Sequence, residues 1–197
     1  SSLGNASNFE NLVGTISGND TLTGDNNANV LIGSGAADTL YGNDGNDSLY
    51  GDYHTSDNGG STYGLRQYDI SSNQGNDLLY GGSGNDTLVG NDGDDKLDGG
   101  TGADTLTGGS GIDTFITRSG DGGSSTSDAD TITDFADGTD LVGLDSLAYS
   151  GLTIAQGTGD NANHVSVSVT STSEKLMLIQ NVSVSNINYF DFVSTSY

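Results

Sequence analysis

The chain has 197 residues and a formal net charge of −23, because only four lysine and arginine residues stand against 27 aspartate and glutamate residues. With 32 glycines and 31% hydrophobic residues, it approaches the composition of a disordered acidic linker, so a stable fold needs an additional source of stability. The absence of cysteine excludes disulfides, zinc–thiolate sites and a thiol nucleophile. The strong negative charge argues against nucleic acid as a partner, and no apolar stretch is long enough to span a membrane.

Residues 1–14 precede the first regular pattern. The segment 9–14, with the sequence FENLVG, is expected to cap the open end of the fold that follows. The chain opens on serine without a targeting segment, which favours a fragment of a longer protein.

A nine-residue pattern then occurs nine times, four times in residues 15–50 and five times in residues 72–116. Its sixth place is aspartate in eight copies and asparagine in one. Its eighth place is always apolar, so a polar ligand and a buried side chain recur in fixed phase. The sixth-place residues are Asp20, Asn29, Asp38, Asp47, Asp77, Asp86, Asp95, Asp104 and Asp113, and the eighth-place residues are Leu22, Leu31, Leu40, Leu49, Leu79, Leu88, Leu97, Leu106 and Phe115.

This spacing predicts an all-β fold. Three residues with one inward side chain form a minimal strand, and six glycine-rich residues form a turn. Two repeats close a coil of eighteen residues, so equivalent residues stack at roughly 4.8 Å. We therefore predict a right-handed parallel β-roll, a form of β-helix, with Ca²⁺ in its turns and a β-rich C-terminal capping region at residues 117–197.

The stacked aspartates require a cation. At ~5 Å and an effective dielectric of ~20, two carboxylates repel by about 3 kcal/mol before screening, and Arg66, Lys96, Arg118 and Lys175 are too few to neutralise them. Calcium accepts six to eight oxygens, including backbone carbonyls, and tolerates flexible geometry better than magnesium. We expect five or more Ca²⁺ ions. Asn29 removes a charge from its site, and Asp47 meets Asp86 only if the intervening insertion loops out.

The predicted metal ligands are carboxylates and glycine carbonyls. The carboxylates are Asp20, Asp38, Asp47, Asp77, Asp86, Asp95, Asp104 and Asp113. The carbonyls are those of Gly18, Gly33, Gly42, Gly45, Gly75, Gly81, Gly82, Gly84, Gly90, Gly93, Gly99, Gly100, Gly102, Gly108, Gly109 and Gly111. Ala36 stands where other copies have glycine and weakens its own copy, because a turn around an ion uses positive φ angles.

The copies at residues 81–89 (GGSGNDTLV) and 99–107 (GGTGADTLT) resemble the RTX nonapeptide G-G-x-G-x-D-x-U-x of the repeats-in-toxin, or hemolysin-type, calcium-binding proteins. The resemblance implies the C-terminal part of a larger secreted protein, extracellular or on the cell surface. Such a module folds on meeting extracellular Ca²⁺ and supports the type I secretion and the stability of its parent.

Residues 51–71 interrupt the repeats. They carry His54, Arg66, Tyr53, Tyr63 and Tyr68, which suit contact with a partner or a sugar, although neutral insertions at turns are common. A Ca²⁺-dependent carbohydrate-binding module for alginate or another glycan, or an adhesive surface module, is therefore the alternative function.

The segment 130–144 (DTITDFADGTDLVGL) resembles D-x-I-x-D-F-x-x-G-x-D-x-I-x-L, which follows such repeats in secreted enzymes. Ile132, Phe135, Leu141 and Leu144 are expected to cover the last coil. Asp130, Asp134 or Asp140 either completes a terminal metal site or belongs to a capping hairpin without metal.

Two further strands are predicted at 164–169 and 176–179. Residues 191–197 resemble the uncleaved C-terminal signals read by type I secretion machinery.

An enzyme active site finds little support in the chain. His54 and His164 are the only histidines, and neither lies in an H-E-x-x-H motif. No G-x-S-x-G elbow occurs. We expect this fragment to be non-catalytic, while the parent protein's identity and activity stay open.

Overall fold

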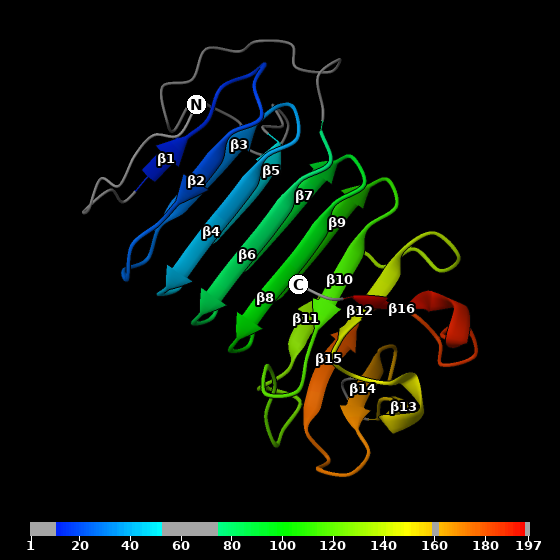
Figure 1. The fold of residues 1–197 in the computed structure, drawn as a ribbon. Coiled ribbons are helices and arrows are strands. Elements are labelled where there is room, and N and C mark those ends of the chain that lie inside the picture. Colours follow the sequence, from blue (N-terminus) through cyan, green and yellow to red (C-terminus); the bar gives the residue numbers. More distant parts are fainter. Residues whose placement is uncertain (1–10, 53–74, 159–161, 196–197) are drawn as a thin grey trace.

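The computed structural model describes residues 11–52, 75–158 and 162–195 (Figure 1). Three predicted features lie wholly or partly outside the described residues: residues 1–10 of the cap at 1–14, the insertion residues His54, Arg66, Tyr53, Tyr63 and Tyr68, and the last two residues of the predicted secretion signal. The strands are β1 (Asn11–Val13), β2 (Thr21–Thr23), β3 (Val30–Ser34), β4 (Thr39–Asp44), β5 (Ser48–Asp52), β6 (Leu78–Ser83), β7 (Thr87–Asp92), β8 (Lys96–Thr101), β9 (Thr105–Ser110), β10 (Thr114–Thr117), β11 (Asp130–Ile132), β12 (Leu141–Asp145), β13 (Leu152–Gln156), β14 (Val165–Val169), β15 (Lys175–Ile179) and β16 (Phe192–Thr195).

Successive strands from β1 to β13 alternate between two sheets, as Figure 1 shows. One sheet has the order β1-β3-β5-β7-β9-β11-β15-β14-β13, and the other has the order β16-β12-β10-β8-β6-β4-β2. Strands of the repeats pair in parallel, whereas β13, β14 and β15 pair antiparallel at one end. The prediction of a parallel β-roll with a β-rich C-terminal region is confirmed.

Helical structure in the described ranges consists of two 3₁₀ turns, η1 (Tyr149–Gly151) and η3 (Tyr189–Asp191). No helix in this part of the chain is long and apolar enough to cross a membrane.

The register shows how the coil continues past the insertion. Leu22 pairs with Leu40, eighteen residues on, and Leu40 pairs with Leu79 in the next coil of the same sheet. In the other sheet, Leu49 pairs with Leu88. The 21 additional residues therefore leave the coil in phase, and the repeats on both sides form one continuous roll.

The interrupted turn starts earlier than the sequence pattern indicates. Strand β5 runs through Asp52, and an added Cβ on Gly51 would lie 2.2 Å from Oδ2 of Asp77, just as one on Gly33 would lie 2.4 Å from Oδ2 of Asp38. Gly51 and Asp52 therefore supply the first two places of the turn that Gly75 and Asp77 complete. The predicted limits of 51–71 assigned Gly51 and Asp52 to the insertion, because the fifth repeat counted back from Asp77 begins at residue 72.

The core is one row of side chains from each sheet. All eight eighth-place leucines and Phe115 are at most 1% exposed. Beyond them, Phe135 packs against Phe115 with ring centroids 6.2 Å apart, and Ile132 and Leu144 are buried as predicted. The expectation for Leu141 is wrong. Val142 pairs with Phe115 and points inward, so the neighbouring Leu141 lies on the outer face and is only half-buried.

The capping region closes the roll at its C-terminal end. Strand β11 adds β15, β14 and β13 to the nine-stranded sheet, and β12 adds β16 to the other sheet. The predicted strands at 164–169 and 176–179 correspond to β14 and β15 and are confirmed. A conventional apolar core from Val165, Val167, Leu176, Ile179 and Phe192 extends the row of leucines.

Candidate metal centres along the turns

The sixth-place residues form two hydrogen-bonded ladders, one on each edge of the roll. On the first edge, the N–H of Asp20 donates to Oδ1 of Asp38 at 2.8 Å, Asp38 to Asp77 at 2.6 Å, Asp77 to Asp95 at 2.8 Å and Asp95 to Asp113 at 3.0 Å. Each carboxylate is thus held in place by the backbone of the preceding coil.

The second edge repeats this arrangement. Asn29 donates to Asp47, Asp47 to Asp86 and Asp86 to Asp104, each at 2.7 Å. Because Asp47 and Asp86 meet directly, the ladder crosses the insertion without a gap.

One carboxylate oxygen is left without a hydrogen-bond partner in the ladder aspartates from Asp38 to Asp113 on the first edge and from Asp47 to Asp130 on the second. While Oδ1 accepts the backbone N–H, Oδ2 is buried and has no hydrogen-bond partner in eight aspartates of the described residues. Buried polar atoms are normally paired, and an unpaired buried charge is costly. These oxygens therefore require a proton or a cation. The eight are Asp38, Asp47, Asp77, Asp86, Asp95, Asp104, Asp113 and Asp130.

The raised pKa values of ladder aspartates also indicate that these carboxylates need a proton or a cation. Burial raises the pKa of Asp77 and Asp86 to about 7 and that of Asp95 to about 8, and neighbouring carboxylates raise it further, although backbone N–H donors oppose the shift. Burial likewise raises the pKa of Asp38 and Asp113 to about 6. Without a cation, the ionised ladder is disfavoured near neutral pH.

The first glycine of each turn faces the unpaired oxygen. An added Cβ on Gly33 would lie 2.4 Å from Oδ2 of Asp38 and 2.4 Å from the carbonyl oxygen of Gly51 in the next coil. The same pair of oxygens converges at Gly42, Gly51, Gly81 and Gly90. A side chain would fill this oxygen-lined space, so glycine is needed there. Carboxylate and carbonyl oxygens are the ligands that hard cations such as Ca²⁺ prefer.

Side chains alone do not complete these sites. Within the described ranges, no group of three or more His, Cys, Asp and Glu residues is arranged to hold a metal ion. A cation with six to eight oxygen ligands would therefore take its remaining ligands from backbone carbonyls and water.

The predicted glycines fall into two groups. Gly33, Gly42, Gly81, Gly90, Gly99 and Gly108 lie against a ladder carboxylate. The others shape and stack the turns. Gly84 has φ 137°, and an added Cβ would lie 1.6 Å from the carbonyl oxygen of Gly45. Close stacking of this kind also applies to Gly45, Gly75, Gly82, Gly93, Gly100, Gly102, Gly109 and Gly111, whereas Gly18 approaches only Oγ1 of Thr15.

The first member of each ladder differs from the rest. Oδ2 of Asp20 accepts hydrogen bonds from the N–H of Thr15 at 2.5 Å and from its hydroxyl at 2.7 Å. Burial works to raise the pKa of Asp20, but these hydrogen bonds lower it overall. The side-chain oxygen of Asn29 accepts the N–H of Asp25 at 2.7 Å. Protein donors already serve both residues.

The ladders extend one residue beyond the repeats. The N–H of Asp104 donates to Oδ1 of Asp130, and that of Asp113 donates to Oδ1 of Asp140, both at 3.1 Å. The ninefold spacing misses them, because they follow by 26 and 27 residues. One signal was available: Ile132 follows Asp130 by two places, as leucine follows aspartate in each repeat.

The ladders end because side chains fill the space above the turns. On the second edge, the strand register puts Thr117 next to Gly99 in the stack of coils, and Leu144 next to Thr117. A hydroxyl-bearing and then an apolar side chain therefore occupy the place that glycine holds in the repeats. On the first edge, the carboxylate of Asp134 accepts the N–H groups of Gly108 at 3.0 Å and Gly109 at 2.9 Å. Asp134 is therefore a cap, whereas Asp130 keeps an unpaired oxygen.

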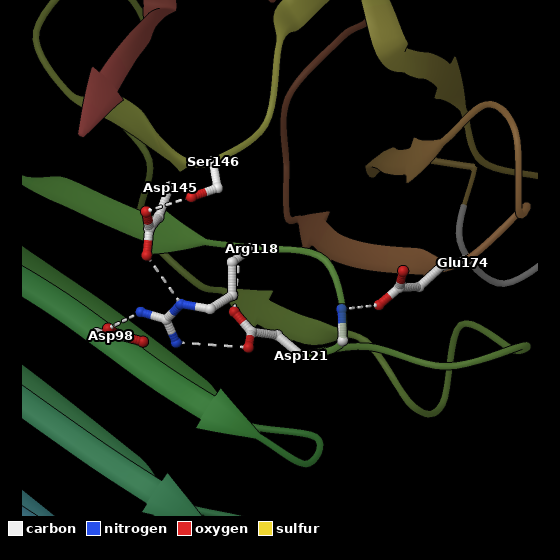
Figure 2. Close-up of polar contacts among 7 residues, drawn as sticks. Asp98, Arg118, Asp121, Asp145, Ser146 and Glu174 are labelled. Carbon is white, nitrogen blue, oxygen red and sulfur yellow. Dashed lines mark hydrogen bonds and ion pairs between the residues drawn. The ribbon is translucent and has the colours of Figure 1, made fainter. Parts of the chain in front are cut away.

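The guanidinium group of Arg118 lies at the junction between the roll and the capping region (Figure 2). Arg118 pairs with Asp98 of β8, with Asp145 of β12 at 3.2 Å, and with Asp121 at 3.5 Å. Burial alone would lower the pKa of Arg118, but the carboxylates raise it. This cluster ties the last coils to the cap, and the sequence pattern did not reveal it.

The outer face of the repeat strands carries an aromatic pair. Tyr41 and Tyr80 on β4 and β6 stack face to face, with centroids 5.1 Å apart and an interplanar angle of 7°. Their facing surfaces cover each other, so this pair offers no open ring between them as a platform for a sugar.

Together these features define a parallel β-roll whose glycine turns are lined with carboxylate and carbonyl oxygens. The chain carries the RTX calcium-binding nonapeptide repeat, and the model of that family matches it in four copies, at residues 23–52, 71–106, 80–115 and 98–122. No curated protein matches the chain.

Several solved structures are similar to it. They include the solution structures of two subunits of the Azotobacter vinelandii mannuronan C5-epimerase. AlgE6R2 has 26% identity and a TM-score of 0.43 over 61% of this chain and 89% of that one, and AlgE6R3 has 21% identity and a TM-score of 0.38 over 91% and 82%. The crystal structure of the extracellular lipase LipA from Serratia marcescens has 15% identity and a TM-score of 0.43 over 91% of this chain. The match spans 40% of the lipase chain.

Proposed function

We propose that this chain is a calcium-binding RTX β-roll module that folds on binding extracellular Ca²⁺. The observation that carries the proposal is the set of buried aspartates whose Oδ2 atoms have no partner and face glycine turns. Cations that take oxygen ligands, bound along the turns, would give all of these atoms a partner.

The proposed ligands are the ladder carboxylates from Asp38 to Asp113 and the carbonyls of the first glycines of the turns. Five turns bring an otherwise unpaired carboxylate oxygen and the next coil's carbonyl oxygen together, at Gly33, Gly42, Gly51, Gly81 and Gly90. This supports the expectation of five or more ions. Asp20 and Asn29 are the weaker ligands, because Thr15 and Asp25 already donate to them.

Calcium binding and folding then form one equilibrium. A roll with a net charge of −23 and a row of unpaired carboxylates repels itself, and the unfolded chain has no preformed site, so binding energy becomes folding energy. Extracellular modules bind calcium at roughly 10⁻⁴–10⁻³ M. Such a module stays unfolded where calcium is scarce and folds outside the cell.

The wider role follows from this switch. We place the module in the C-terminal part of a larger secreted protein, where its C-terminus engages the type I secretion machinery and its folding outside the cell stabilises the parent. We assign it no catalytic role. The one described histidine, His164, accepts the N–H of Asn181 through Nδ1 at 3.2 Å, which is a structural contact.

The first test is a circular dichroism titration from chelator to ~10 mM calcium, which spans the extracellular affinity range, with magnesium as the control. A cooperative gain of β signal with calcium alone is expected. A folded spectrum in excess chelator, or no change with calcium, contradicts the folding switch.

A pair of variants tests the ligand assignment. Asp86→Ala removes an unpaired Oδ2 and the acceptor for the N–H of Asp47 in the middle of a ladder, whereas Asp20→Ala removes a carboxylate at the end of one that Thr15 already serves. Asp86→Ala is expected to lower the number of bound calcium ions more. Equal loss in the two variants, measured by calorimetric titration, argues against the ladder.

A further inference from the structure

The interrupted turn contains a carboxylate that the repeat pattern does not account for. Asp52 is 2% exposed, and neither of its carboxylate oxygens has a hydrogen-bond partner. It is the one aspartate of the described residues with both oxygens buried and unpaired. None of the ion pairs in this part of the chain involves it.

The backbone around Asp52 is well defined by its neighbours in the stack. Asp52 pairs with Ser34 of the preceding coil. The backbone carbonyl oxygen of Asp52 accepts the side-chain N–H of Asn91 at 2.9 Å. Serine and asparagine, both uncharged, therefore stand in the corresponding places of the adjoining coils. On this edge of the roll, Asp52 is the one charged residue at the second place of a repeat turn, although Asp25 holds the same place on the other edge.

The surroundings of Asp52 are acidic. Its carboxylate lies within electrostatic reach of Asp38, Asp77 and Asp95. Burial raises the pKa of Asp52 to about 7 and Asp95 adds to this, while the N–H of Gly75 opposes it without reaching hydrogen-bonding geometry. Directly before Asp52, Gly51 faces Oδ2 of Asp77 and the carbonyl oxygen of Gly90.

We propose that Asp52 is an additional metal ligand, which joins Asp77 and the carbonyl of Gly90 in holding a divalent cation at the interrupted turn. The inference rests on the proposed calcium-binding function and extends it to a residue outside the nonapeptide ligand set. With one more carboxylate than its neighbours, this site binds Ca²⁺ most tightly in the roll, since ligand charge tunes calcium affinity.

The test compares Asp52→Asn with the wild-type chain and with Asp137→Asn, a matched loss of one charge at an exposed residue of the cap. Asparagine suits the turn, because Asn43 and Asn91 hold the equivalent second place in two other turns. Asp52→Ser, which reproduces the serine at position 34 of the preceding coil, is the second variant. Bound calcium per chain and individual affinities are measured by equilibrium dialysis and calorimetry, and folding at saturating calcium by circular dichroism.

Both Asp52 variants are expected to fold at saturating calcium and to lose the tightest binding step by about tenfold or more, given that loss of even an outer-shell partner weakens metal sites 10–100-fold. Asp137→Asn is expected to match the wild type. Unchanged tight binding in Asp52→Asn overturns this inference alone, as does failure of both Asp52 variants to fold, which indicates a structural role. A wild-type chain that binds no calcium overturns the proposed function as well.

Discussion

Acid is expected to stabilise the calcium-free roll. Burial raises the pKa of Asp38 to about 6, that of Asp86 to about 7 and that of Asp95 to about 8 in the folded chain, against 3.8 ordinarily. Because the folded state holds these protons more tightly than the unfolded state, the calcium-free fold is most stable near pH 4 and loses stability as the pH rises through 6 to 8. Protonation removes the charges that calcium would otherwise neutralise.

The size of the effect follows from individual residues. Raising the pKa of the buried Asp113 from 3.8 to about 6 corresponds to about 3 kcal/mol lost between acid and neutral pH. Neighbouring carboxylates are coupled, so their penalties do not simply add. Even so, the free-energy penalty of ionising two or three such carboxylates is a large part of the roughly 5–15 kcal/mol by which a domain is typically stable.

The assay is circular dichroism of calcium-free protein between about pH 5 and about pH 9, a window that brackets the ladder's titration and stays above the isoelectric point of about 4.1. More β structure is expected at the lower pH. With calcium present the direction reverses, because protons compete with the metal for the carboxylates. A calcium-free chain that is equally or less folded at the lower pH refutes the reasoning.

Three substitutions probe the fold itself. Leu88→Ala, at a fully buried core position, is expected to lower the free energy of unfolding in saturating calcium by about 2–5 kcal/mol. An equal loss for the half-buried Leu141→Ala, in the same denaturant titration, would contradict the assigned core. Gly84→Ala introduces a Cβ against the carbonyl of the preceding coil and is expected to raise the calcium midpoint of folding, whereas Gly151→Ala, with open space around it, leaves the midpoint unchanged. Arg118→Met removes the ionic partner of three carboxylates at the junction with the cap. It is expected to lower the free energy of unfolding by about 2–3 kcal/mol, between the values for exposed and fully buried ion pairs. An unchanged melting temperature would show that the cluster does not hold the cap to the roll.

The periodic part of this fold can be predicted from the sequence. The two-place offset between each sixth-place residue and the following apolar side chain is a local relation, and repetition every nine residues turns it into a coil. The spacing alone therefore places Asp86 on its ladder and Leu88 in its core row.

The parts that escaped prediction depend on contacts across coils. Gly51 and Asp52 join a turn that resumes at Gly75, and no local pattern records this. Leu141 and Val142 are both apolar, and the pairing of Val142 with Phe115 shows that Val142 is the one that points inward. Asp130 was a candidate for a terminal metal site, but it follows Asp104 at an irregular distance, and the strand pairing is what assigns it to the second ladder.

The ladder also has a direction. Every ladder N–H donates to a carboxylate of the following coil, and the last two acceptors, Asp130 and Asp140, belong to the capping region. Removing coils from the N-terminal side therefore leaves all remaining ladder donors with their acceptors. Removing the cap leaves Asp104 and Asp113 without acceptors for their buried N–H groups. The roll can accordingly be shortened from its beginning, whereas its end is indispensable to the coil before it.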